Sequence, residues 1–144
     1  MTYSGYFRPK NPKKYIGDHN NIIYRSSWEC RVMTWLDNNP AIVSWASEEL
    51  TIPYISPVDN KYHRYYPDFL VKVKGRDGTI KVMLLEIKPK KQTKEPQKKK
   101  RVTKQYIYEV TTWGVNQAKW KAATEYCLDR GWEFKIITED HLGL

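Results

Sequence analysis

Apolar residues recur at two different spacings along the chain, and the changes between them mark the expected helices and strands. The first helical stretch runs from Ser26 to Asn38, where large apolar side chains return every three or four positions. These side chains are Trp28, Val32, Trp35 and Leu36. Ser26 is a favourable N-cap residue, and Asn39-Pro40 ends the stretch. We therefore predict a helix over residues 26–38 with both tryptophans facing the core.

Extended segments follow this helix. Residues 42–50 have the composition of a strand, and residues 52–57 are interrupted by prolines. Residues 62–74 and 79–88 are rich in strand-forming side chains, and the segment Gly75-Arg76-Asp77-Gly78 between them is typical of a turn. The last two segments are therefore predicted to form an antiparallel pair of strands.

The C-terminal third of the chain returns to the helical period and then ends in a strand. Residues 112–130 carry apolar side chains at helical spacing, and Gly131 is typical of a residue that ends a helix. The core-facing residues are Val115, Trp120, Ala123 and Cys127. Residues 132–138 alternate between apolar and polar as in a strand. The order helix, three strands, helix, strand predicts an α/β fold, with a mixed β-sheet of about four strands flanked by helices.

Two acidic residues and a lysine stand at the ends of the two paired strands. Asp68 follows Pro67 at the head of one apolar run, and Glu86 and Lys88 end the other. Since successive strand residues point to opposite faces, Glu86 and Lys88 project to the same side. Two carboxylates and an ammonium group that meet on adjacent strands can hold Mg²⁺ and a water molecule, which is the chemistry needed to hydrolyse a phosphodiester.

These three residues also have a simpler interpretation. Glu86 and Lys88 would end the strand in solvent as a weak surface pair, and Asp68 would cap a turn after Pro67. However, Glu86 shares its face with the apolar side chains of Val82 and Leu84, where an unpaired carboxylate is costly. The coincidence of both acids and the lysine on paired strands favours a site.

Glu29 is a third candidate acid. The spacing Ser26-x-x-Glu29 fits a capping box, in which the Glu29 carboxylate bonds back to the Ser26 amide. Glu29 also borders the apolar stripe of its helix, from where the side chain can reach over the sheet. Both interpretations remain open from the sequence.

Composition narrows the class of partner. The chain has 144 residues, enough for one domain, and its 40% hydrophobic content is too high for a disordered protein. A net charge of +9 favours a polyanion such as nucleic acid. Cys30 and Cys127 lack the spacing of a zinc site or disulfide framework, so both are expected to be reduced. With no apolar leader and no membrane-spanning run, we expect a soluble, intracellular protein without membrane contact.

Basic residues concentrate between residues 90 and 104. Such a run is usually a solvated, mobile segment, but here it directly follows Lys88 and could neutralise phosphates without reading bases. Its basic members are Lys90, Lys91, Lys94, Lys98, Lys99, Lys100, Arg101 and Lys104. We expect residues 1–23 to form a basic and aromatic N-terminal arm, and residues 24–144 to form one domain with a basic insertion at 90–104.

Three segments together resemble a known superfamily. Arg25-Ser26-Ser27-Trp28-Glu29, Tyr66-Pro67-Asp68-Phe69 and Glu86-Ile87-Lys88-Pro89 are similar to the motifs of PD-(D/E)XK nucleases, which have a restriction-endonuclease-like core. The similarity is narrower to TnsA-type transposon endonucleases, and closer still to the head completion nucleases of large contractile-tailed phages. It spans about residues 22–140 but not the basic insertion. The transposon relatives carry Gln at the position of Glu86.

The resemblance implies a metal-dependent DNA endonuclease that uses Mg²⁺, with Mn²⁺ as a substitute. Asp68, Glu86 and the backbone carbonyl of Ile87 would bind the metal, and Lys88 would orient or deprotonate the attacking water. Glu29 would act on the metal through water or help to hold a second ion. The residues expected to contact DNA are the eight basic residues of the insertion together with Gln117 and Lys119.

The implied setting is phage head completion. The protein would act on packaged DNA ends as a monomer, with head or portal proteins as further partners, in the host cytoplasm or the virion head. The alternatives are a non-catalytic protein that binds DNA ends in the virion, the cleaving subunit of a transposition complex, and a structure-specific resolvase. The complete set of Asp68, Glu86 and Lys88 argues against the first alternative, and the short chain argues against the second.

Overall fold

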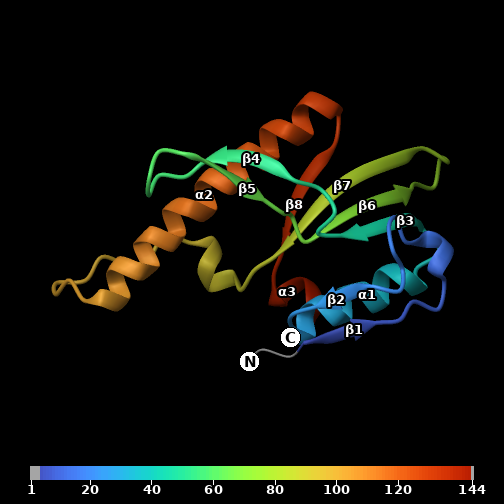
Figure 1. Cartoon of the computed structure of the whole chain (residues 1–144), viewed down its shortest axis with the longest axis horizontal. Helices are drawn as coiled ribbons and strands as arrows, with labels where there is room; N and C mark the ends of the chain where they lie inside the picture. The colour runs from blue at the N-terminus through green and yellow to red at the C-terminus, as the bar shows by residue number, and fades with distance from the viewer. Residues whose placement is uncertain (1–3, 144) are drawn as a thin grey trace.

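A four-stranded mixed sheet forms the centre of the computed structural model, which describes residues 4–143 (Figure 1). The strands lie in the order β3-β6-β7-β8. Their bounds are Ile42–Ser47 for β3, Phe69–Lys74 for β6, Ile80–Ile87 for β7 and Glu133–Ile137 for β8. β6 runs antiparallel to both β3 and β7, whereas β8 runs parallel to β7. The predicted α/β fold with a mixed sheet of about four strands is confirmed.

Helices and short strand pairs cover the two faces of the sheet. α1 (Ser27–Asn38) lies on one face beside the antiparallel pair β1 (Gly5–Phe7) and β2 (Ile22–Tyr24). α2 (Lys104–Arg130) covers the other face together with a hairpin of β4 (Ile52–Ile55) and β5 (Tyr62–Tyr65). The short helices η1 (Pro12–Lys14), η2 (Lys90–Thr93) and α3 (Glu139–Leu142) complete the described chain. No helix within residues 4–143 has the length and apolarity required to cross a membrane.

Each face of the sheet has its own hydrophobic core. On the α1 side, Trp45, Phe69 and Leu85 pack against Met33 and Leu36. On the α2 side, the core consists of Ile52, Tyr54, Tyr65, Leu84, Trp120, Ala123 and Cys127. Because adjacent strand residues alternate between faces, Leu84 and Leu85 of β7 face opposite cores. Glu86 is therefore on the face that α2 covers.

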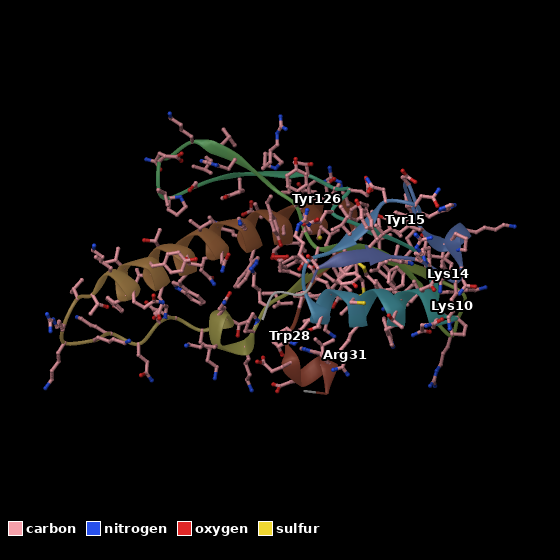
Figure 2. The ribbon with its side chains drawn as sticks, turned by 60° about the horizontal axis from the view of Figure 1, so that its bottom comes forward. Lys10, Lys14, Tyr15, Trp28, Arg31 and Tyr126 are labelled. Atoms are coloured by element: carbon pink, nitrogen blue, oxygen red, sulfur yellow. The ribbon has the colours of Figure 1, made fainter. Side chains whose placement is uncertain are left out.

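The N-terminal segment is locked onto the end of α1. The Lys14 ammonium donates to the carbonyl oxygens of three residues at the end of the helix, Leu36, Asp37 and Asn39, at 2.8–2.9 Å. The buried Asp37 carboxylate accepts the backbone amides of Lys10 at 2.7 Å and Asn11 at 3.1 Å. Figure 2 shows Lys10 and Lys14 together at this end of α1. These contacts satisfy carbonyls that a helix end otherwise leaves without partners.

The N-terminal segment also contributes to the fold beyond this contact. Tyr15 and Ile22 belong to the core on the α1 side, and β2 crosses the boundary that was expected between residues 23 and 24. Residues 1–3 of the expected arm lie outside the described residues. Cys30 and Cys127 are free cysteines in the structure.

Several predicted elements differ from those in the structure. The strand predicted over residues 62–74 is divided into β5 and β6, because Pro67 has no amide to donate to a ladder and the chain changes partner there. The strand predicted over residues 42–50 ends at Ser47, where Glu48 adopts a left-handed backbone conformation with φ of 53°. A hairpin therefore stands apart from the main sheet where one long strand was expected.

The two helices also differ in detail from the prediction. α2 begins at Lys104 rather than near residue 112, because the Thr103 hydroxyl caps it by accepting the Tyr106 amide at 3.1 Å. In α1, the prediction that Trp35 faces the core is wrong: its side chain is 56% exposed. The buried stripe of α1 is Val32, Met33 and Leu36, and Trp35 lies beside this stripe.

Candidate nuclease active site

Asp68 and Glu86 face each other across the end of β6 and β7. Phe69 pairs with Leu85 in the antiparallel register, so the next residue outward on each chain brings Asp68 opposite Glu86. Leu70 and Leu84, two positions inward, pack into the core on the α2 side. The two carboxyl groups therefore lie on the face covered by α2, and Glu86 is only 5% exposed.

Burial and mutual repulsion dominate the electrostatics of this pair. Burial raises the pKa of Asp68 well above its usual range, and the negative charge of Glu86 raises it further. The Ile87 amide opposes the shift by donating to Asp68 Oδ2 at 2.7 Å, as does the Lys88 ammonium. Burial also raises the pKa of Glu86, against hydrogen bonding with Asp68 and Tyr65 and the positive charges of Lys88 and Lys119. Two buried carboxyls held this close are typical of sites that bind a cation or a proton.

Two lysines reach the pair from different elements. Lys88 continues the strand after Glu86, and its amide donates to the Ile137 carbonyl at 2.9 Å, which ties this segment to β8. Lys119 projects from α2, where burial and then repulsion by Lys88 lower its pKa. The negative charges of Glu86 and Asp68 act on it in the opposite direction. Both predicted lysines therefore come close to the two carboxyl groups.

Glu29 acts as a helix cap and also borders the acidic site, so both interpretations that the sequence left open apply to it. Its amide donates to Ser26 Oγ at 3.1 Å, so Ser26 caps α1 as predicted. Its carboxylate accepts the Arg25 amide at 2.5 Å, rather than the Ser26 amide of a standard capping box. Burial raises the pKa of Glu29, with additional contributions from the charges of Asp68 and Glu48. Glu29 is thus a helix-capping residue at the border of the acidic site.

Arg25 and Glu48 also belong to this border, although neither was expected from the sequence to be a site residue. Their side chains form an ion pair, and the charges of Glu29 and Asp68 act on Arg25 as well. The Glu48 amide donates to the Asp68 carbonyl at 3.1 Å. This bond places Glu48, just after β3, next to Asp68, just before β6. The sequence contains no signal for this contact, because it depends on how β3 pairs with β6.

The basic residues proposed to contact DNA lie in different surroundings. Lys90 is engaged with α3: its ammonium is 3.0 Å from Asp140 and its amide donates to Glu139. The remaining basic residues of the insertion are exposed and lead from η2 to the start of α2. Gln117 is exposed in a groove between α2 and β8, away from Lys119. A cleft of about 580 Å³ separates the basic segment from the first half of α2.

The acidic site offers hard oxygen donors. Within residues 4–143, no three His, Cys, Asp or Glu side chains converge closely enough to bind a metal by themselves. Asp68 and Glu86 supply two carboxylates, and the Ile87 backbone lies next to both. Mg²⁺ commonly binds to one or two carboxylates and completes its octahedron with water and substrate phosphate oxygens. This donor set fits Mg²⁺ better than it fits zinc, which prefers nitrogen and sulfur ligands.

Comparisons with known proteins identify a nuclease family. Residues 39–139 match the family described as "TnsA-like endonuclease N terminal". The chain is also 44% identical over 146 residues to a protein of Enterobacteria phage T4 named "Head completion nuclease", covering 99% of this chain and 95% of the relative. No solved structure matches the chain significantly. Asp68, Glu86, Lys88 and Lys119 lie inside the matched family region, whereas Arg25 and Glu29 precede it.

Proposed function

The chain belongs to the TnsA-like endonuclease family, and we propose that it is a metal-dependent DNA endonuclease of phage head completion whose reaction centre is formed by Asp68, Glu86 and Lys88. One observation carries the location of this centre. Two carboxyl groups face each other at the buried ends of β6 and β7, and a lysine follows two residues after one of them. A protein that only binds DNA gains nothing from paired acids beside phosphates.

Asp68 and Glu86, with the Ile87 carbonyl, would hold Mg²⁺, and Mn²⁺ would substitute because it also accepts oxygen ligands. When bound, such an ion lowers the pKa of a coordinated water and polarises a phosphoryl oxygen. The Ile87 amide fixes one oxygen of Asp68 at 2.7 Å, which limits the rotation of this carboxyl group. Burial of Glu86 beneath α2 restricts its rotamers in the same way.

Lys88 supplies the positive charge on the side of the attacking water. It lies two residues beyond Glu86, and its backbone is held by β8, so its ammonium remains on the face of the two carboxylates. From there it orients the water and stabilises the charge that develops on phosphorus oxygens. Glu29 lies farther out, with its carboxylate bonded to the Arg25 amide, and would act through a water molecule or a second ion.

DNA would be bound mainly through its phosphates. Apart from Lys90, the basic residues of the insertion are exposed and form no ion pair among residues 4–143. Such contacts neutralise phosphates and carry little sequence information. The substrate would be DNA ends exposed when a phage head is completed, with head or portal proteins nearby in the host cytoplasm or the virion. The similarity to the T4 protein named "Head completion nuclease" supports this proposed setting.

Cleavage of supercoiled plasmid tests the proposal. We expect nicking or linearisation with Mg²⁺ or Mn²⁺, none with EDTA, and loss of at least 10³-fold in Glu86→Ala and Asp68→Asn, because alanine offers no oxygen ligand and a neutral amide binds a hard cation more weakly than a carboxylate does. Asp77→Asn is the matched control, since Asp77 is exposed in the turn before β7. Far-ultraviolet circular dichroism should be unchanged in all variants. Metal-independent DNA binding without any cleavage would instead favour a structural protein that binds DNA ends.

A further inference from the structure

Lys119 brings a second ammonium group to the reaction centre from the opposite layer of the molecule. α2 crosses one face of the sheet (Figure 1). This is the face on which Asp68 and Glu86 lie, and Trp120 and Ala123 of α2 pack against Leu84 of β7 there. Lys119 is half-buried, and the charges of Lys88, Glu86 and Asp68 all act on it. Its ammonium is therefore part of the same electrostatic site.

Two tyrosines of the β4-β5 hairpin hold the Lys119 side chain. The ammonium lies over the rings of Tyr54 and Tyr65, 5.9 and 5.7 Å from their centroids. These distances are within the range of cation–π attraction. Tyr54 and Tyr65 are buried, and they lie on neighbouring strands whose register pairs Tyr65 with Ile52. The hairpin, which has no counterpart in the predicted fold, thus fixes this lysine over the carboxyl pair.

The Lys119 ammonium has three hydrogen-bond donors, and no acceptor or ion-pair partner for them occurs among residues 4–143. A partly buried ammonium that is held by aromatic faces alone retains its capacity to bind an anion. This distinguishes Lys119 from Lys14, whose donors are all used by the end of α1, and from Lys90, which is paired with Asp140.

A second observation at the same place also points to a ligand. The Tyr65 side chain is 3% exposed, and its hydroxyl interacts with the Glu86 carboxyl without forming a hydrogen bond of normal geometry. Two indole nitrogens, of Trp45 and Trp120, also lack a hydrogen bond of normal geometry within the described chain. Only the Tyr65 hydroxyl lies near the charges of both Glu86 and Asp68. A buried hydroxyl whose hydrogen bonding is incomplete is normally completed by a water molecule or a bound group.

The charge balance of the site indicates the chemistry of the group that would bind beside Lys119 and Tyr65. Two carboxylates and two ammonium groups cancel, and Arg25, Glu29 and Glu48 at the border of the site add one net negative charge. A divalent cation bound by Asp68 and Glu86 therefore leaves one positive charge in excess, carried mainly by the cation and the two ammonium groups. These charges are partly shielded from water beneath α2, where electrostatic interactions are stronger than in solvent. The loaded site therefore attracts an anion, and the anion that a nuclease presents there is the phosphate group of its substrate.

We propose that Lys119 binds a non-bridging oxygen of the substrate phosphate at the reaction centre, opposite Lys88, and that Tyr54 and Tyr65 position it for this contact. The proposal rests on the proposed nuclease function and deepens it. Lys119 is then a catalytic residue contributed by α2, distinct from the exposed lysines of the basic segment. Those lysines provide affinity for DNA, whereas Lys119 acts on the phosphate that reacts.

Single-turnover cleavage at saturating protein and metal separates these roles. We expect Lys119→Met to lower the cleavage rate at least tenfold while changing DNA affinity less than threefold, and Lys119→Arg to recover part of the rate because the charge is retained. The matched control is Lys121→Met, because Lys121 is exposed on the same helix and lines the groove beside β8. Its rate should remain within twofold of the unmodified protein. A rate within twofold for Lys119→Met would overturn the proposal.

A second measurement does not depend on cleavage. Lysine acetylation is followed by mass spectrometry with and without a duplex oligonucleotide, using Ca²⁺ as the oxygen-binding cation. We expect DNA to protect Lys119 at least threefold and to leave Lys121 unchanged. Slow cleavage by Lys119→Met without protection would mean that Lys119 is only a counter-ion of Glu86, and would refute the phosphate contact. Protection of Lys119 in a protein that cleaves no DNA would instead refute the nuclease function and leave the contact standing.

Discussion

The paired carboxyl groups should make the metal-free protein less stable than a variant that lacks one of them. We predict that Asp68→Asn, which abolishes cleavage, stabilises the folded state at pH 7.5 in EDTA. Burial and the charge of Glu86 both disfavour an ionised Asp68. An asparagine has nearly the same shape, carries no charge, and still offers an oxygen to the Ile87 amide that Asp68 accepts at 2.7 Å. The substitution therefore removes repulsion and retains the hydrogen bond.

The size of the effect follows from the geometry. Side chains directly opposite in an antiparallel pair have Cβ atoms about 5 Å apart, and two unit charges at that distance repel by about 3 kcal/mol at an effective dielectric constant of about 20. Partial access of water to Asp68 reduces this figure, so we expect a gain of about 1–3 kcal/mol in the free energy of unfolding. For a chain of this length, the melting temperature should rise by about 3–10 °C.

The gain in the free energy of unfolding should increase as the pH rises. Because folding raises the pKa of Asp68, the folded protein binds this proton more tightly than the unfolded chain does. The stability that the proton confers is fully present below the unfolded pKa, about 3.9, and is lost as the pH rises through the folded pKa. The advantage of Asp68→Asn should therefore be absent near pH 3.5 and grow towards neutral pH.

Thermal unfolding in EDTA and in Mg²⁺ provides the assay. Metal binding to the folded state stabilises the unmodified protein, by about 2.7 kcal/mol at a hundredfold excess over the dissociation constant, and should stabilise Asp68→Asn much less. The order of the two melting temperatures should thus reverse when Mg²⁺ is added. Asp77→Asn serves as the control for a carboxylate that is not buried. If Asp68→Asn melts below the unmodified protein in EDTA at pH 7.5, the native contacts of the Asp68 carboxylate outweigh its repulsion by Glu86, and the reasoning is refuted.

Two further predictions concern lysines outside the reaction centre. Lys14→Met should lower the free energy of unfolding, measured in urea, by about 1–2 kcal/mol, since three carbonyls at the end of α1 lose their donor. The control Lys13→Met replaces an exposed neighbour and should have little effect. Equal losses of stability in the two variants would argue that Lys14 does not cap the helix. Replacing Lys98, Lys99 and Lys100 together by Gln should weaken DNA binding and reduce the slope of log affinity against log salt by up to about 2.7. Fluorescence anisotropy at several salt concentrations measures this slope, and an unchanged slope would show that the basic segment does not contact phosphates.

The regular parts of the fold could be predicted because one physical pattern determines each of them. α1 has an N-cap at Ser26 and a helical apolar period, and β7 has a run of apolar residues that ends in Glu86. The hairpin of β4 and β5 could not be separated from β6 in the same way. Its residues have strand-forming side chains throughout, and the break at Pro67 becomes evident only when the partners of each strand are known.

The start of α2 was missed for a different reason. The lysines around Thr103 suggested a solvated segment, and eight exposed or half-buried residues before residue 112 give no apolar stripe. Helical propensity and the Thr103 cap are sufficient there, because the helix is already nucleated by its packed C-terminal half. A pattern based on burial alone cannot detect the part of a helix that extends beyond its core.

The helical period does distinguish the two residues of α2 that were predicted to contact DNA. The buried stripe of α2 is Asn116, Trp120, Ala123 and Cys127. Lys119 is three residues after Asn116 and four before Ala123, so it borders one flank of the stripe. Gln117 is three residues before Trp120 and borders the other flank. β7, α2 and β8 form a parallel crossover in which α2 packs on one face of the sheet, so only one flank can face the carboxyl pair. The contacts of Lys119 with Tyr54 and Tyr65 indicate that its flank faces the carboxyl pair, whereas Gln117 lines the groove beside β8. We therefore expect any contact of Gln117 with DNA to lie in that groove.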